Sequence, residues 1–181
     1  YRLSDLRSLM GYVPQDQFLF ASSILDNVRF GNPDLSFDKV EEATKLAQVY
    51  DDIKDMPEGF ETIIGEKGVS LSGGQKQRLA MSRAMILDPD ILILDDPLSA
   101  VDAKTEHAII DNLKHTRKDK TTIITAHRLS AVVHADLILV MQDGRIIERG
   151  RHEDLLAQGG WYAKTYESQQ LEMEGGEEDD A

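Results

Sequence analysis

The chain has 181 residues, 41% of them hydrophobic and 29% charged, and it contains no cysteine. This length is enough for one domain with a sizeable core, and the composition excludes disulfides and cysteine-based metal sites. The formal net charge is −13, of which six negative charges lie in residues 171–181 and −7 remains for the rest. An acidic body argues against nucleic-acid binding, which needs a basic face.

The first fifty-six residues are predicted to be mostly helical. The chain begins without an initiator methionine, so we expect a fragment of a longer protein. Ser4–Met10 has a helical pattern, and Gly11–Val13 is predicted to be the end of a strand. After a polar loop, Phe18–Phe20 is an apolar cluster that could be core or a surface for another element. Residues 18–56 are then helical without a strand signal, with Ser22-Ser23 and Ser36 as caps.

The middle of the chain changes to an α/β pattern. Gly59–Gly68 is expected to be a loop or a weak pair of strands, and Gly74–Leu87 to be a helix. Ile91–Leu94 is a continuous apolar run, which suits a strand buried on both faces of a parallel sheet. A helix is predicted over Asp102–His115 and another strand over Thr121–Thr125.

The last third is predicted to contain a hairpin and helices. Asp143-Gly144 lies between two strand-like runs and is a strong hairpin signal. A short helix is expected at Leu129–His134, and further helices at His152–Ala157 and Trp161–Gln170. Residues 171–181 are acidic and predicted to be disordered.

Four places along the chain suggest chemistry. Ser72 can cap a helix, and the glycines after it leave amides and the positive end of the helix dipole open to a phosphate. Asp95 ends a buried strand, where a carboxylate suits Mg²⁺ held through water. His127 follows another strand and could donate a hydrogen bond to a phosphate oxygen. Gln15 follows the first strand and could contact water, Mg²⁺ or a partner. An ordinary structural role is the alternative at each place.

The order of these signals is more specific than any one of them. With Leu98–Asp102 added, five segments resemble, in chain order, the Q-loop, the signature motif, the Walker B strand, the D-loop and the switch-histidine segment of ATP-binding-cassette (ABC) ATPases: Tyr12–Gln15, Leu71–Gln75, Ile91–Asp95, Leu98–Asp102 and Thr125–Arg128. The signature segment Leu-Ser-Gly-Gly-Gln is identical to that of the family. The resemblance covers about residues 1–168.

The resemblance implies an α/β fold: the carboxyl-side part of a P-loop NTPase-type ABC ATPase domain, with an inserted all-helical subdomain. Residues 1–17 would be the end of the core sheet and the Q-loop, and 18–85 the helical subdomain with the signature motif. Residues 86–170 would be the nucleotide-binding core from Walker B to the C-terminal helices, followed by the acidic tail 171–181.

The resemblance also implies roles for individual residues, with ATP and Mg²⁺ as cofactors. Two such domains meet head to tail, so the signature residues would bind ATP in trans, held by a second nucleotide-binding domain: Leu71, Ser72, Gly73, Gly74 and Gln75. The other roles are catalysis by Asp96 and His127, Mg²⁺ binding through water by Asp95 and Gln15, and dimer coupling by Ser99 and Asp102.

Two departures from the family pattern stand out. No Gly-x-x-x-x-Gly-Lys-Ser/Thr phosphate loop (Walker A) occurs in these 181 residues, so we expect the isolated chain to bind ATP weakly and to turn over none. Asp96 stands where the family usually has a catalytic glutamate. Its carboxylate sits roughly 1 Å farther back, and a misplacement of that size can lower a rate about 10²-fold.

These features favour one function and leave two alternatives. Thr62–Gly68 resembles the loop by which exporter-type members contact transmembrane helices, and Phe18–Phe20 is a second expected contact with transmembrane domains. We therefore expect an ATP-hydrolysing half of a membrane exporter at the cytoplasmic face of the cell membrane. It would be the degenerate-site half of a heterodimeric, multidrug-type pair. The alternatives are a soluble ABC ATPase and a non-catalytic regulatory module.

Overall fold

The computed structural model describes residues 2–65 and 68–178, the last six of these by their backbone alone. The chain folds into two compact units, Tyr1–Ala126 and His127–Ala181. The boundaries expected at residues 17, 85 and 170 were drawn between motifs and do not coincide with the division between these units. They stay predictions.

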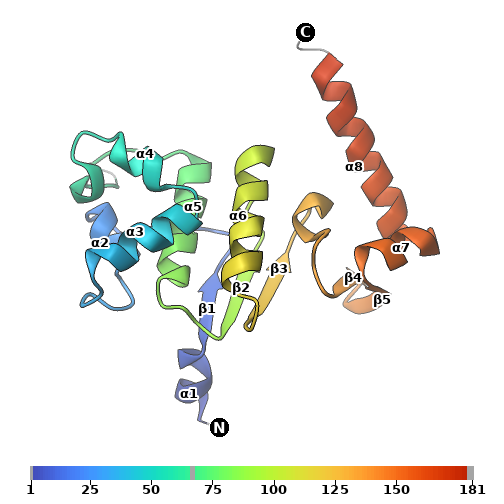
Figure 1. Ribbon diagram of the computed structural model, residues 1–181, viewed down its shortest axis with the longest axis horizontal. Coiled ribbons are helices and arrows are strands. Elements are labelled where there is room, and N and C mark those ends of the chain that lie inside the picture. The colour runs from blue at the N-terminus through green and yellow to red at the C-terminus, as the bar shows by residue number, and fades with distance from the viewer. Residues whose placement is uncertain (1, 66–67, 179–181) are drawn as a thin grey trace. The chain divides into compact units, whose positions relative to one another are not determined.

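A three-stranded parallel sheet forms the centre of the first unit (Figure 1). Its strands are β1 (Met10–Val13), β2 (Ile91–Asp95) and β3 (Thr121–Thr125), in the order β1-β2-β3. Helix α1 (Leu3–Ser8) precedes β1. In the register of the sheet, Asp95 at the end of β2 pairs with Thr125 at the end of β3. The carboxyl ends of all three strands therefore lie along one edge, where open α/β sheets bind ligands.

The central strand is buried less completely than its apolar run predicts. Leu92 and Leu94 are fully buried, whereas Ile91 and Ile93 on the opposite face are only partly covered. The expectation of burial on both faces is therefore met on one face only. Ile123 of β3 is 49% exposed on the same sheet, so the described residues leave part of this surface open.

Helices make up the rest of the first unit, as the periodicity predicted. Figure 1 shows α2 to α5 grouped beside the sheet. The elements are α2 (Ile24–Val28), α3 (Phe37–Leu46), α4 (Tyr50–Lys54), the 3₁₀ turn η1 (Gly59–Glu61), α5 (Gly73–Met85) and α6 (Ala103–Thr116). The cap expected at Ser23 is present, because its Oγ accepts from Asp26 N at 3.0 Å. Ser36 occupies the N-cap position of α3, but its side chain makes no capping hydrogen bond. In the described part of the stretch after η1, the pairings are isolated bridges, Ser23 with Ile63 and Ile64 with Val69.

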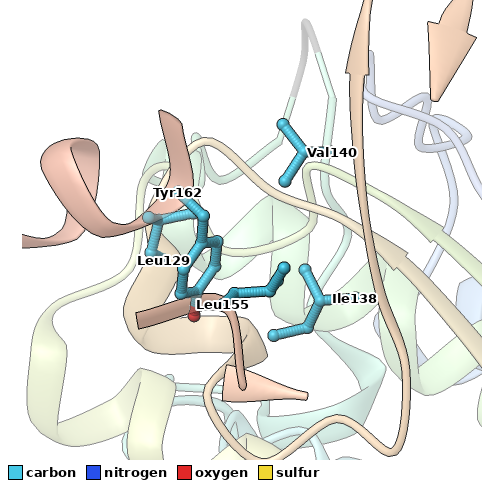
Figure 2. Close-up of a cluster of buried hydrophobic side chains, with 5 residues drawn as sticks. All are labelled: Leu129, Ile138, Val140, Leu155 and Tyr162. Atoms are coloured by element: carbon cyan, nitrogen blue, oxygen red, sulfur yellow. The ribbon is translucent and has the colours of Figure 1, made fainter. Parts of the chain in front are cut away.

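The second unit packs two helices against a hairpin. Its elements are the 3₁₀ turn η2 (Leu129–Val132), β4 (Ile138–Gln142), β5 (Arg145–Gly150), α7 (His152–Gln158) and α8 (Trp161–Glu178). Asp143 and Gly144 have φ of +50° and +74°, the left-handed pair that a tight hairpin requires, and this confirms the predicted turn. Figure 2 shows the buried side chains at its core: Leu129, Ile138, Val140, Leu155 and Tyr162.

The start of α8 is fixed by polar contacts with its neighbours. Glu148 accepts hydrogen bonds from the amides of Trp161 and Tyr162, which caps the helix. The Tyr162 hydroxyl lies 2.8 Å from His152 Nδ1, and burial raises the pKa of Tyr162. A helix start held in this way makes each further residue of the helix easier to add.

Helix α8 corrects the prediction for the tail. The acidic composition predicted disorder from residue 171, but the helix continues to Glu178. The prediction rested on the acidic residues and on Gly175-Gly176, and it neglected propagation from a helix whose start is well fixed. Residues 179–181, also predicted to be disordered, lie outside the described residues. Within 2–65 and 68–178, every helix is too short or too polar to cross a bilayer.

Candidate functional site

The signature segment begins α5 with a complete capping box. Ser72 Oγ accepts from Gln75 N at 3.2 Å, and Gln75 Oε1 accepts from Ser72 N at 3.0 Å. The predicted cap is therefore confirmed, while the second bond of the box, from Ser72 N to the Gln75 side chain, was not predicted. The Ser-x-x-Gln spacing is the signal that could have identified it.

The first turn of α5 has the electrostatics of an anion site. The amides of Gly73 and Gly74 are the first of the helix and have no carbonyl partner within it. Ser72 and Gly73 are exposed, and no acidic residue lies in the first turn. Lys76, also exposed, adds a positive charge beside it. Together with the helix dipole, this arrangement favours a phosphate group.

The segment 98–102 is held tightly against this helix start. A Cβ atom on Gly74 would lie 2.6 Å from the carbonyl oxygen of Ala100, so the close approach requires glycine. Gln77, buried on α5, donates to Ser99 Oγ at 2.8 Å and accepts from Ala100 N at 3.0 Å. The structure therefore brings Ser99 to the signature helix, through a glutamine that the sequence analysis did not single out.

Asp102 ends the same segment and caps the next helix. Its Oδ1 accepts from Thr105 N at 3.0 Å, and the hydrogen bonds from Thr105 lower the pKa of Asp102. The carboxylate is therefore held ionised at the N-terminus of α6, where the helix dipole favours negative charge. This contact gives Asp102 a structural role in this chain. Its coupling role in a dimer stays a prediction.

The carboxyl ends of the strands bring a second set of polar groups together. Asp95 Oδ1 accepts from Thr125 Oγ1 at 2.6 Å, and its Oδ2 accepts from Tyr12 OH at 3.4 Å. The amide of Asp96 donates to Thr125 O at 3.1 Å and to Thr125 Oγ1 at 3.0 Å. Asp96 has φ of +46°, in the left-handed region that aspartate tolerates better than most residues.

These groups fit Mg²⁺ only as contacts through water. No group of three or more His, Asp or Glu side chains that could hold a metal occurs within the described ranges. The carboxylate of Asp95 is already fixed by Thr125. Such an oxygen suits the hydration shell of Mg²⁺, an ion that usually keeps several waters.

The structure places the remaining predicted residues at the ends of strands. Gln15 is exposed just after β1, and its carbonyl accepts from Gln17 Nε2 at 2.5 Å. His127, with an exposed side chain, opens the second unit, and its carbonyl accepts from Gln169 Nε2 at 2.9 Å. Their roles toward Mg²⁺, water or phosphate stay predictions.

An aromatic surface lies beside the second half of α5. Phe18 and Phe30 are 67% and 57% exposed, and the Phe20 ring packs against both, with ring centroids 5.0 and 4.2 Å apart. Phe18 and Phe30 line a hollow of about 280 Å³ together with residues of β1 and α5. The cluster Phe18–Phe20, predicted as core or surface, is thus a surface at Phe18.

Arg83 of α5 holds this aromatic surface in place. Its guanidinium donates to Phe18 O at 2.8 Å, to Asn27 O at 2.8 Å and to Asn27 Oδ1 at 2.6 Å. The same group lies over the rings of Phe20 and Phe30, at 5.3 and 5.8 Å. Arg83 was not singled out from the sequence, because its partners lie 56 and 65 residues away.

The predicted exporter-type loop lies beside the beginning of α2. Ile24 N donates to Thr62 O and Ile64 N donates to Ser22 O, both at 3.0 Å. These bonds bring the loop close in space to the segment that follows Phe18–Phe20. Glu66 and Lys67 of the predicted stretch Thr62–Gly68 lie outside the described residues.

Comparisons with known proteins agree with this geometry. A family model described as "ABC transporter" matches residues 1–99. The chain is 56% identical over 169 residues to "Probable multidrug resistance ABC transporter ATP-binding/permease protein YheI" of Bacillus subtilis, covering 93% of the chain and 29% of that protein. It is 47% identical over 171 residues to "Multidrug resistance-like ATP-binding protein MdlA" of Escherichia coli, covering 94% and 29%.

A solved structure, that of a bacterial Atm1-family ABC exporter with ATP bound, matches with a TM-score of 0.85 and 40% identity. The match covers 92% of this chain and 29% of that one. The chain thus spans less than a third of the length of these relatives. The motif order, the mixed α/β fold and these matches agree: the chain belongs to the ABC transporter family, as part of its ATP-binding domain.

Proposed function

We propose that this chain powers export across a membrane by completing an ATP site shared with a second nucleotide-binding domain, at the cytoplasmic face. The observation that carries the proposal is the capped start of α5, whose exposed Ser72 and Gly73 lie in a first turn without acidic residues. The likeness to proteins named as ATP-binding/permease and multidrug resistance proteins supports export over a soluble ABC ATPase.

The site that the signature completes would take its phosphate loop from the partner domain. The 181 residues contain no phosphate-loop motif, while their signature motif is intact. Asp95 would hold water on the Mg²⁺ of its own domain's site, where the ion would neutralise phosphate charge. Leu71, the apolar residue of the signature, is buried and fixes the start of the motif.

Asp96 gives this chain the weaker of two ATP sites in the proposed pair. An aspartate is one methylene shorter than the family's usual glutamate, and its backbone is left-handed. We infer that hydrolysis is slow where Asp96 is the carboxylate, and fast where this signature meets a competent partner subunit. His127 would contact phosphate at the weaker site. A regulatory module without any turnover is the second candidate that Asp96 supports.

The aromatic surface and the exporter-type loop would receive the transmembrane domain. Phe18 and Phe30 are large apolar side chains exposed beside a hollow, and Thr62–Gly65 lies against the adjacent segment. Exposed aromatic residues around a groove suit the apolar face of a short helix. Ser99 and Asp102, on the segment packed against α5, would transmit closure between the two ATP-binding domains.

The test is ATP turnover by the full-length protein, assembled with its partner, with a charge placed in the signature. Gly74→Asp puts a carboxylate where phosphate is expected and a Cβ 2.6 Å from Ala100 O. We expect turnover to fall by about two orders of magnitude or more.

Gly59→Asp is the matched control. It adds the same charge to the same unit, at a glycine with nothing within 4 Å of its Cβ position and a φ of +51° that aspartate tolerates. Turnover of this variant should stay normal. Normal turnover of Gly74→Asp would show that the signature does not take part in the ATP site.

A further inference from the structure

Asp52 of α4 reaches the signature helix with both carboxylate oxygens. Its Oδ1 accepts from Gln75 Nε2 at 2.9 Å, and its Oδ2 accepts from Arg78 Nη1 at 2.8 Å. We propose that Asp52 is a positioning residue for the signature motif, one that sets the affinity of the shared site for ATP. The inference rests on the proposed function, in which that motif contacts ATP held by the partner.

Both partners of Asp52 are themselves bonded to the signature. Gln75 uses its Oε1 to close the capping box on Ser72 N, so Asp52 fixes the amide group in the orientation that the cap needs. Arg78 donates through Nε to the carbonyl of Gly74 at 3.2 Å, and through Nη1 to the carbonyl of Gln48. The carboxylate of Asp52, on α4, therefore fixes the Gln75 side chain directly and the backbone of Gly74 through Arg78.

The surroundings of this ion pair make it stronger than an ordinary surface pair. The side chains of Asp52 and Arg78 are 29% and 14% exposed, against 58% for both members of the pair Lys39–Glu42 on α3. The attraction between opposite charges is screened less by solvent in a partly buried pair than in an exposed one. The pair also joins residues 26 apart, so it fixes α4 against α5 rather than one helix against itself.

The expected kinetic signature of such a residue is a change in KM rather than in kcat. Asp52 lies behind the motif and touches no reacting group of the proposed site. A loosened first turn would weaken contact with ATP in the ground state and in the transition state alike, which raises KM and leaves kcat nearly unchanged. A purely structural role would instead reduce the amount of active protein, so that the maximal rate falls at constant KM.

The experiment measures steady-state ATP hydrolysis of the full-length assembly with Asp52→Asn. The substitution keeps the shape, but presents an NH₂ group to Arg78 or to Gln75. We expect KM for ATP to rise about tenfold, with kcat within about twofold of the parent. Asp52→Glu restores a carboxylate and should recover most of the lost affinity. In a Gln75→Ala background, Asp52→Asn should raise KM by less than it does alone, because the hydrogen bond between Asp52 and Gln75 is already absent.

Asp88→Asn is the matched control for this experiment. It removes the carboxylate of another long-range ion pair, Asp88–Lys120, with an N···O distance of 2.7 Å. Asp88 has φ of +46°, which asparagine adopts readily, and it lies beyond the other end of α5. KM should be unchanged in this variant.

Two outcomes separate failure of the inference from failure of the proposed function. The positioning role is overturned if Asp52→Asn leaves KM unchanged, or only reduces the maximal rate. In that case Gly74→Asp still lowers turnover as expected, and the proposed shared site stands. If Gly74→Asp leaves turnover intact, the proposed shared site is wrong, and the role of Asp52 is overturned with it.

Discussion

Asp96 combines a short carboxylate with a left-handed backbone directly after β2. Its amide is fixed by two bonds to Thr125, so the side chain cannot move forward by a backbone shift without breaking them. Glutamate, the family's usual residue, is less favourable at a φ of +46° than aspartate. The residue is therefore well adapted to this turn, and the proposed function expects its short carboxylate to reach an attacking water poorly.

Replacing Asp96 tests the assignment of the weaker site. In the full-length assembly, we expect Asp96→Asn to lower ATP turnover by less than about tenfold, because the proposed pair would hydrolyse ATP mainly at the other site. Removal of the partner's catalytic carboxylate should abolish it. The measurement is steady-state hydrolysis of both variants side by side, with Asp96→Glu as a third. If Asp96→Asn is as damaging as the partner's variant, Asp96 serves the competent site.

At the scale of elements, caps and turns were readable from the sequence, whereas contacts between elements were not. Ser72 and the Asp143-Gly144 turn are local signals, because the bonds they make lie within three residues. Gln77 with Ala100 and Asp52 with Gln75 join residues 23 positions apart. No periodicity predicts which two helices meet. The contact of Thr125 with Asp95 likewise depends on the register of β2 and β3.

The motifs predicted the parts of the site but not their supports. The order of Gln15, the signature and Asp95 came from pattern, and the structure places each at a strand end or a helix start. The supporting side chains carry no motif of their own. Arg83 and Arg117 illustrate this. Arg83 donates to the carbonyls of Phe18 and Asn27, and Arg117 donates to the carbonyl of Pro89, 28 residues away.

Arg83 is expected to hold the aromatic surface against α5. Lysine at this position keeps the charge but loses the planar fork that bonds Phe18 O and Asn27 together. In Arg83→Lys, we expect the amides of residues 18–31 to exchange with solvent about tenfold faster, because local opening there becomes easier. Hydrogen exchange followed by peptide mass spectrometry measures this directly.

Arg117→Lys is the control for that experiment. Burial lowers the pKa of both arginines, and Arg117 also donates to backbone carbonyls, at Pro89 and Thr121. Its contacts lie just before β2 and at the start of β3, whereas Arg83 contacts Phe18 and Asn27. Exchange in residues 18–31 should be unchanged in this variant. Equal acceleration in both would mean that the substitutions loosen the whole unit and that Arg83 has no special link to Phe18.

At the scale of the whole molecule, the exposed surface of the sheet and the missing phosphate loop have the same explanation. Within the described residues, β3 pairs only with β2, and Ile123 on it is about half exposed. The same 181 residues lack a phosphate loop. Both features are explained if the chain supplies one part of an ATP-binding domain and further segments supply the rest, in keeping with its coverage of 29% of its relatives.

The last prediction concerns the 181-residue chain on its own. Without the lysine and the amide cradle of a phosphate loop, the start of α5 offers only a dipole, a few amides and the exposed Lys76. We expect titration calorimetry with ATP and Mg²⁺ to show only weak binding, lost on raising the salt concentration, and no phosphate release. Gly74→Asp should remove even that weak signal. Affinity in the low micromolar range that survives Gly74→Asp would place a complete nucleotide site elsewhere in this chain.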